Sequence, residues 1–364
     1  MPTPTGHVKL FIPGPTEVRP DVLAEMSRPI ISHRGAEMEA LQRDVSAQAA
    51  RIMHTTHQIL LSSSSATGLM EGGIRNGVER RVLSLVCGAF SARWHKIALD
   101  CDKQADALSV PWGRAIEPAE VDRALSTGAY DAVTLVHNET STGVANPLAE
   151  IAAVVMRHPD VLLMIDTVSS LGGLPVKVDE LGADLCLASV QKALALPPGF
   201  SLCAVSPRLI ERSRRAKGKG FYFDFARMLD KAEKHQPLTT PSVSHMFAMQ
   251  RQFAHILAEG LEARWARHRE MAGIVRAWAK RRFALFADEA HASDTVTCVQ
   301  NTSGVDVAAL ISKLRAEGML ISNGYGDMKG KAFRIAHMGE LTSADVGGLL
   351  AAIDRILPGT GAAR

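Results

Sequence analysis

The sequence is poor in the features that mark several special classes of protein. Its 364 residues include only five cysteines, which are scattered and have no paired spacing. We therefore expect no disulfide scaffold and no zinc or other metal site, and reduced cysteines are typical of a cytoplasmic protein. The amino-terminal residues lack the charged start and the apolar core of a signal peptide, which leads to the same expectation.

Excess charge and long apolar runs are missing as well. The formal net charge is only +3, and no dense basic run or alternation of basic and aromatic residues is present, so nucleic-acid binding is not expected. No apolar run is long enough to cross a membrane. What the chain does have is a hydrophobic content of 46%, and at this length one large and one smaller domain are expected.

Two short apolar runs are each followed by a residue that can carry charge. Residues 161–165 are too few for a helix and predict a buried strand that ends in Asp166. A second strand predicted over residues 184–188 leads to Lys192. A right-handed crossover between parallel strands would bring both side chains to the carboxyl edge of one sheet, where open α/β folds bind ligands.

Lys192 has apolar and small neighbours and is soon followed by two prolines and a glycine, residues 197–199. Removal from water would lower the pKa of its amine and make it a candidate Schiff-base nucleophile. A lysine at a sheet edge can equally extend its stem to reach water. Asp166 alone is more often a helix cap or an ion-pair partner, so it is the pair at this spacing that favours a reactive site.

The segment DTVSS at residues 166–170, together with SVQK at residues 189–192, resembles the class V, fold-type I aminotransferases that use pyridoxal 5′-phosphate (PLP), close to the alanine-glyoxylate and serine-pyruvate enzymes. The resemblance covers nearly the whole chain. It implies an α/β fold with a mostly parallel sheet of the seven-stranded type, covered by helices, and a smaller carboxyl-terminal α+β domain. We expect an amino-terminal arm over residues 1–20, a large PLP-binding domain over 21–258 and a small domain over 259–364.

The resemblance also implies roles for individual residues. Lys192 would bond covalently to PLP, and Asp166 would hold the ring nitrogen protonated so that the ring can act as an electron sink. The further cofactor contacts that it implies are Ser65, Ala66 and Thr67 at the phosphate, Phe90 and Val168 on the two ring faces, Thr140 and Gln191 at ring substituents and phosphate, and Thr239 at the phosphate of the other subunit in a homodimer with shared active sites.

Some of these positions can also be explained by ordinary structural roles. The sequence departs from the family pattern at three places. Residues 62–67 form a serine-rich turn that could bind phosphate at a helix start, although serine and threonine cap helices everywhere. The turn lacks the glycines that are usual in the family. Phe90 stands where tryptophan is frequent, and Gln236 stands where relatives often carry tyrosine.

Arg334 lies in an otherwise apolar strand predicted over residues 332–336. Its guanidinium needs an acceptor, which could be an internal carboxylate or, as the resemblance implies, the α-carboxylate of an amino-acid substrate. The implied reaction is a ping-pong transamination from a small amino acid, alanine or serine, to a 2-oxo acid, glyoxylate or pyruvate. Aspartate as donor would need a second cationic group, for which Arg34 is the candidate.

Two other functions remain as alternatives. A PLP lyase such as a cysteine desulfurase would need a reactive cysteine on a mobile loop and usually a histidine before the lysine, whereas this chain has Gln191 there and Cys298 in a strand-like segment. A catalytically silent PLP-binding protein would keep Asp166 but would not need both Lys192 and Arg334. Their joint presence favours an enzyme.

Overall fold

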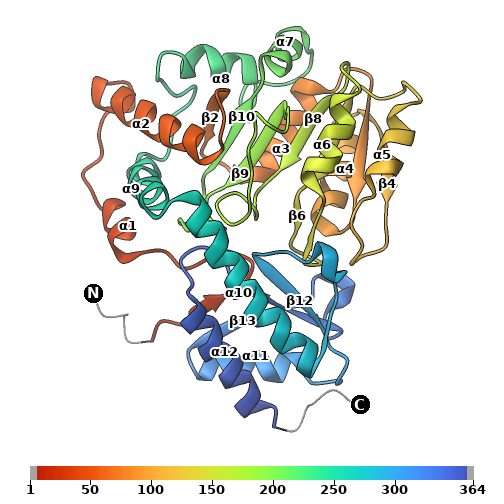
Figure 1. Ribbon diagram of the computed structural model, residues 1–364. Coiled ribbons are helices and arrows are strands. Elements are labelled where there is room, and N and C mark those ends of the chain that lie inside the picture. The colour runs from red at the N-terminus through yellow and green to blue at the C-terminus, as the bar shows by residue number, and fades with distance from the viewer. Residues whose placement is uncertain (1–5, 359–364) are drawn as a thin grey trace.

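The computed structural model describes residues 6–358 of the chain. Its larger part is a sheet between layers of helices, and a smaller part with its own sheet lies beside it, drawn mostly in blue in Figure 1. Within residues 6–358, no helix combines the length and the apolar character that a bilayer crossing requires.

The large sheet has seven strands in the order β2-β10-β9-β8-β5-β3-β4. Only β10 runs antiparallel to its neighbours, so the expected mostly parallel sheet is confirmed. The strands are β2 (Gln58–Ser62), β3 (Arg81–Val86), β4 (Gln104–Ser109), β5 (Ala132–Val136), β8 (Leu162–Asp166), β9 (Leu185–Ser189) and β10 (Ser201–Val205).

Helices cover both faces of this sheet. Successive residues of β8 alternate between two apolar clusters: Leu163 and Ile165 join one, Leu162 and Met164 the other, as expected for a strand between two helical layers. The helices of this domain are α2 (Ala36–Ile52), α3 (Ala66–Gly77), α4 (Ala89–Asp100), α5 (Pro118–Leu125), α6 (Leu148–Met156), α7 (Pro207–Arg215), α8 (Phe225–Ala232) and α9 (Val243–Glu259).

The small sheet has the order β1-β13-β14-β12-β11. Its edge strand β1 comes from the amino-terminal arm and runs parallel to β13. Its strands are β1 (Lys9–Phe11), β11 (Ala284–Leu285), β12 (Val296–Gln300), β13 (Met319–Asn323) and β14 (Ala332–Ala336), with helices α10 (Leu261–Arg282), α11 (Val307–Ala316) and α12 (Ser343–Ile356). The remaining short elements are α1 (Pro20–Glu25), β6 (Asn138–Glu139), β7 (Val144–Ala145), η1 (Glu289–His291) and η2 (Gly326–Met328).

The helical sequence pattern of residues 242–281 predicts one long helical tract, whereas the structure has two helices there. α9 ends at Glu259 and α10 begins at Leu261, with Gly260 between them at φ 83°. Because glycine has no Cβ, it adopts this positive φ without steric cost and lets the chain turn. α9 then packs on α2 of the large domain, while α10 packs on α12 of the small one.

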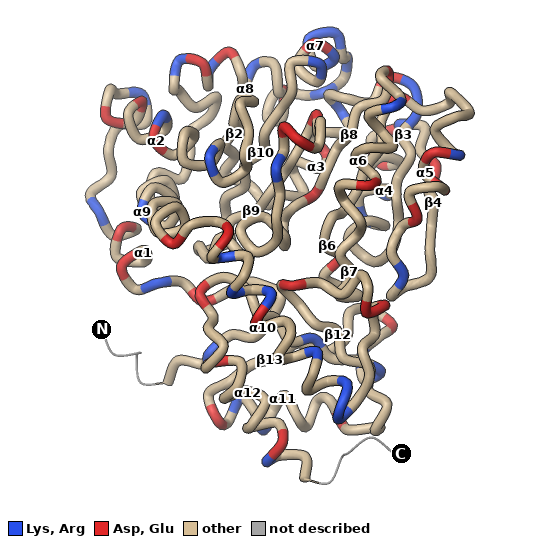
Figure 2. Tube along the Cα trace, in the orientation of Figure 1, with Lys and Arg blue, Asp and Glu red and all other residues tan. Residues whose placement is uncertain are grey.

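Basic residues are concentrated on α7, drawn in blue in Figure 2. Several of them, and Lys219 after the helix, have acidic partners. These ion pairs join Arg212 to Asp131, Arg214 to Asp230, Arg215 to Glu79 and Lys219 to Asp224. The cluster is therefore largely neutralised within the chain, as expected for a solvated face of the protein.

Candidate active site

Asp166 and Lys192 follow neighbouring parallel strands. Asp166 is the last residue of β8 and stands opposite Leu187 of β9, and Lys192 lies in the turn three residues beyond the end of β9 at Ser189. Because the two strands run in the same direction, both residues lie at the carboxyl edge of the large sheet.

The Asp166 carboxylate is buried and only partly satisfied. Its Oδ1 accepts the backbone N–H of Val168 at 2.6 Å, and no donor within residues 6–358 bonds to Oδ2. Burial raises the pKa of Asp166 to about 7, and the charge of Glu139 acts in the same direction; the Val168 N–H, Lys192 and Arg93 oppose the rise. An N–H donor at Oδ2 would stabilise the ionised form.

Lys192 has a perturbed amine as well. Burial lowers its pKa to about 8, assisted by Arg334 and Arg93 and opposed by Asp166. The side chain is still partly accessible to solvent. An amine in this state is deprotonated in an appreciable fraction of molecules near neutral pH, as a nucleophile or a proton acceptor must be.

The amino-terminal arm packs directly against this lysine. The Lys192 ammonium donates a hydrogen bond to the carbonyl oxygen of Pro13. A Cβ on Gly14 would lie 2.6 to 2.9 Å from the last three atoms of the lysine side chain, so any larger residue there would force the amine to move. The amino-terminal arm therefore contacts the central residue of the site.

The serine-rich turn leaves the start of α3 uncapped. Ser65 is the N-cap residue but its side chain makes no capping hydrogen bond, and Ser65 and Thr67 are exposed, while Ala66 is buried. The neighbouring hydroxyls are engaged elsewhere, since Ser63 Oγ accepts the N–H of Ser242 at 2.8 Å. Free N–H groups and hydroxyls at a helix start are suited to bind an anion such as phosphate.

Phe90 lies in the first turn of α4 and is held there by Glu139. The fully buried Glu139 carboxylate accepts the N–H groups of Phe90 and Ser91, at 3.1 and 3.0 Å to its Oε2. It also accepts the hydroxyls of Ser91 and Ser141, at 3.0 and 2.6 Å. A carboxylate at a helix N-terminus is favourable, and it fixes the backbone from which the partly exposed Phe90 ring projects.

The other predicted cofactor contacts occupy turns around this edge. Val168 bonds to Asp166 through its backbone, as described above, and its side chain is partly buried. The Ser189 hydroxyl donates to Gln191 Oε1 at 2.5 Å and orients that amide. Thr140 is buried, and its carbonyl oxygen accepts a hydrogen bond from Arg334 Nη1 at 3.2 Å.

Arg334 has no acidic partner among the residues that the structure describes. Its Nε donates to the carbonyl oxygen of Asn323 at 3.1 Å, which with the Thr140 carbonyl gives two neutral acceptors. In the part of the chain that the structure describes, no carboxylate lies within ion-pair distance of its guanidinium. Burial lowers the pKa of Arg334, so the site contains a costly, uncompensated cation that an incoming carboxylate would neutralise.

Thr239 is not connected by hydrogen bonds to Asp166 or Lys192 within the described residues. Its loop is fixed to α2, because Gln236 Nε2 donates to Glu39 Oε1 at 2.8 Å. Thr239 lines a surface groove with Ser63 and Tyr222. Across residues 6–358, no hydrogen bond joins it to Asp166 or Lys192, so a contact with cofactor in another subunit stays a prediction.

Arg93 and Tyr325 are two site residues that were not predicted. Arg93 Nη2 donates to the Tyr325 hydroxyl at 3.2 Å, and the Tyr325 ring lies 5.5 Å from that of Phe90. One signal for Arg93 was available, because it lies three residues after Phe90 and so on the same face of a helix. Tyr325 lies in a loop of the other domain, and nothing local in the sequence indicates that it reaches α4.

The family model described as "Aminotransferase class-V" matches residues 9–328. The chain belongs to the class V aminotransferases. An uncharacterized aminotransferase of Methanocaldococcus jannaschii is 37% identical over 357 residues, which are 96% of this chain and 92% of that protein. The L-aspartate–glyoxylate aminotransferase of Paracoccus denitrificans is 31% identical over 93% of this chain and 88% of its own. The crystal structure of an alanine–glyoxylate aminotransferase from Nostoc sp. superposes with a TM-score of 0.91 at 29% identity, covering 98% and 96% of the two chains.

The site of this aminotransferase fits PLP. The buried Asp166 has an oxygen without a donor, and the start of α3 is uncapped. Lys192 supplies an amine of lowered pKa, and Phe90 presents part of its ring. The free oxygen of Asp166 suits a protonated ring nitrogen, and the start of α3 suits a phosphate. The amine of Lys192 suits an aldehyde, and the Phe90 ring suits the face of an aromatic ring. The protein is a PLP-dependent transaminase of fold type I.

Proposed function

We propose that this transaminase moves the amino group of a small amino acid, alanine or serine, to glyoxylate or pyruvate in a ping-pong cycle. The observation that carries the proposal is the Arg334 guanidinium, which has two carbonyl acceptors and no carboxylate partner in the described chain. It is electrostatically coupled to the Lys192 amine. A group that binds a carboxylate beside a group that moves a proton is what the α-carbon of an amino acid requires.

Each residue has a distinct task in this scheme. PLP, when bound, withdraws electrons from the bonds of the substrate α-carbon. Asp166 holds the proton of the ring nitrogen, and Phe90 and Val168 pack on the two ring faces. The Ser65 turn with Ala66 and Thr67 binds phosphate, and Thr140 and Gln191 bond to polar groups around the ring. Arg334 orients the α-carboxylate. Lys192 takes the α-proton of the donor in the first half-reaction and delivers a proton to the α-carbon of the product amino acid in the second.

The active enzyme in this proposal is a cytoplasmic homodimer with shared sites. Thr239 would contact the phosphate held by the other subunit. Two observations support this: Thr239 has no bond to its own Lys192 in the described chain, and the nearby Phe221 and Tyr222 are exposed by 55% and 43%. Mixed dimers of Thr239 and Lys192 variants test it, because one complete site should reappear only if subunits share residues.

The lyase alternative receives no support from the cysteine that it would use. Cys298 is buried in β12, and burial raises the pKa of its thiol to about 12. A thiol in that state does not form the nucleophilic thiolate that desulfurases need. The aspartate alternative, by contrast, has a residue to support it, because Arg93 is a second cation near Arg334.

The absorption spectrum of the purified holoenzyme tests the proposed function. The band of lysine-bound PLP should disappear when L-alanine or L-serine is added and should return with glyoxylate or pyruvate. A Lys192→Ala variant serves as control, because it should not complete a cycle. A band that persists with every amino acid would contradict transamination, and a silent binding protein would then be the better description.

A further inference from the structure

A second guanidinium lies on the same side of the site as Arg334. Arg93, on α4, bonds to the Tyr325 hydroxyl at 3.2 Å, and its Cζ lies 4.9 Å from the centre of the Phe90 ring. Tyr325 precedes η2 in the small domain, and the centre of its ring is 5.5 Å from the Arg334 Cζ. One tyrosine therefore contacts both guanidinium groups.

Arg93, too, lacks an acidic partner in the described part of the chain. No carboxylate within residues 6–358 is at ion-pair distance from it, although it is exposed. Lys96, one turn further along the same helix, shows the usual alternative, since it pairs with Asp100 at 2.8 Å. Arg93 instead bonds to Tyr325 and acts electrostatically on the Lys192 amine, so it is placed to bind an anionic ligand of the active site.

In the described chain the two nearby acids form no ion pair with either guanidinium, although the charge of Glu139 still acts on Arg334. Both oxygens of Glu139 are occupied by the N–H and hydroxyl groups at the start of α4. Asp166 bonds to Val168 and faces the position of the cofactor ring. The two guanidinium groups share Tyr325 and both act on the Lys192 amine, and among the described residues neither has an ion-pair partner, so a bound anion would stabilise them.

The cofactor phosphate is one anion that could satisfy Arg93, but the contacts favour another. Phosphate already has the uncapped start of α3, with its N–H groups and hydroxyls. Arg93 is linked through Tyr325 to Arg334, which is the residue that binds substrate in the proposed function. The second cation therefore belongs to the substrate side of the site.

We propose that Arg93 binds the distal carboxylate of a dicarboxylic substrate whose α-carboxylate is held by Arg334. Tyr325 positions Arg93 for this contact. The inference rests on the proposed transaminase function and extends its donor range from alanine and serine to short dicarboxylic amino acids of the aspartate type. Arg93 is then the residue that decides between neutral and acidic donors.

The kinetic test compares donors in single-turnover reactions of the holoenzyme. For Arg93→Gln, the ratio of kcat/KM for L-aspartate to kcat/KM for L-alanine should fall about 10- to 150-fold, as expected for one charge-assisted interaction. Arg93→Lys should recover part of the ratio, because lysine keeps the charge but loses the planar fork. Tyr325→Phe, which removes only the hydroxyl, should give a smaller fall.

Lys96→Gln is the matched control. It removes one positive charge from the same helix, and its partner Asp100 lies on that helix as well. The donor ratio of this variant should equal that of the wild type. An equal fall in both variants would show that only the general charge of α4 matters and would overturn the proposal.

A binding measurement decides the same question without turnover. Calorimetry of the holoenzyme should show tighter binding of succinate than of butyrate, which has the same number of carbons and one carboxylate fewer. Arg93→Gln should remove most of the difference. Equal binding of the two acids by the wild type would overturn the role of Arg93 even if transamination is observed, and so would loss of PLP from Arg93→Gln, because that would assign the residue to the phosphate. If no amino acid reacts, the proposed function fails, and the succinate comparison still decides on Arg93.

Discussion

Thr16 donates a hydrogen bond from its hydroxyl to the backbone carbonyl oxygen of Lys192 at 2.9 Å. The amino-terminal arm is thereby tied to the lysine that follows β9, while β1 of the same arm is paired with β13 in the small domain. The arm therefore connects the small sheet to the reactive amine. Changes in the arm should affect catalysis although the arm contributes no catalytic group.

Gly14→Ala is the sharpest test of the arm. The new Cβ would lie within 2.9 Å of three Lys192 atoms and would displace the amine, so we expect kcat to fall by about 100-fold, a loss typical of misplaced reacting groups. Gly14 also has a φ of 96°, so alanine should cost about 1 to 2 kcal/mol of unfolding free energy. Steady-state kinetics and urea unfolding measure the two effects.

Gly128→Ala separates these effects. Gly128 has a φ of 69°, and a Cβ added to it would have no atom within 4 Å, so this variant should lose a similar free energy of unfolding and keep its kcat. If both glycine variants lost activity equally, backbone strain alone would explain the result and the contact with Lys192 would be irrelevant.

Asp166→Asn should change how the stability of the cofactor-free protein depends on pH. Burial raises the pKa of Asp166 from 3.8 to about 7, so the folded protein binds its proton more tightly than the unfolded chain does. The free energy of unfolding should therefore fall as the pH rises from about 4 to about 7. The asparagine side chain does not titrate. Between pH 5 and pH 8 the unfolding free energy of the variant should therefore rise, relative to that of the wild type, by on the order of 3 kcal/mol.

Urea unfolding of the two cofactor-free proteins at pH 5 and pH 8 measures this gain. The same variant should bind PLP more weakly, because asparagine cannot stabilise the proton on the ring nitrogen as a carboxylate does. A stability difference that is the same at both pH values would mean that the Asp166 pKa is not raised in the folded state.

Much of the large sheet, and the two reactive residues Asp166 and Lys192, could be predicted because the sequence signals that mark them are local. Apolar runs that are too short for helices mark β8 and β9, and Asp166 and Lys192 lie at their ends. The pairing of β1 with β13, by contrast, joins segments some 300 residues apart, and no local pattern encodes it. The break at Gly260 was missed because helical sequence continues on both sides of a single glycine, and Tyr325 was missed because loop geometry decides where it reaches.

Glu139→Gln should loosen the start of α4. An amide oxygen can accept only some of the hydrogen bonds that the Glu139 carboxylate receives from Phe90, Ser91 and Ser141, and the charge at the helix N-terminus is lost. We expect about 2 to 3 kcal/mol less unfolding free energy and weaker PLP binding, since the Phe90 ring loses its fixed base. Thermal unfolding and PLP titration measure both.

Ser141→Ala is the milder comparison for Glu139. It removes a hydroxyl that donates to the carboxylate and accepts the N–H of Ala89 but leaves the charge, so the loss should be about 1 to 2 kcal/mol. A Ser141 effect as large as that of Glu139→Gln would mean that the hydroxyl, rather than the carboxylate, organises the turn.

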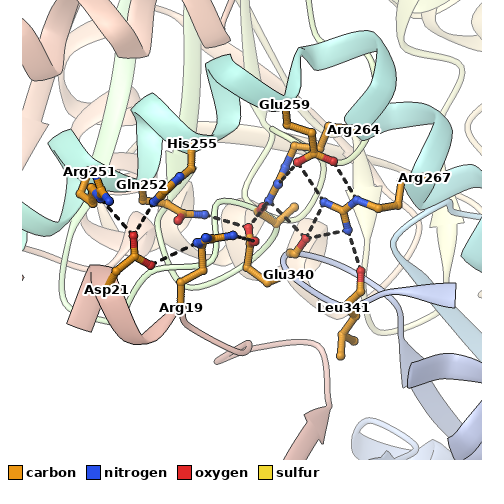
Figure 3. A network of polar contacts seen from close by, with 12 residues as sticks. Arg19, Asp21, Arg251, Gln252, His255, Glu259, Arg264, Arg267, Glu340 and Leu341 are labelled. Carbon is orange, nitrogen blue, oxygen red and sulfur yellow. Dashed lines mark hydrogen bonds and ion pairs between the residues drawn. The ribbon is translucent and has the colours of Figure 1, made fainter. Parts of the chain in front are cut away.

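Arg264→Met should destabilise the contact between the domains. This arginine is 1% exposed and pairs with Glu259 and Glu340 in the network of Figure 3, and its Nη2 donates to the Ala193 carbonyl oxygen, directly after Lys192, at 2.8 Å. Glu259 keeps Arg267 and Glu340 keeps Arg19 as partners, so the loss of the charge-assisted hydrogen bonds of Arg264 should cost about 2 to 3 kcal/mol. Because the lost bond lies beside Lys192, kcat should fall in the fraction of the protein that remains folded.

Arg269→Met, on the same helix, removes an exposed arginine whose carboxylate partner is 3.7 Å away, and it should cost less than about 1 kcal/mol. Urea unfolding with activity measured at low denaturant distinguishes the two variants, and equal stability losses would show that the buried network contributes no more than a surface pair.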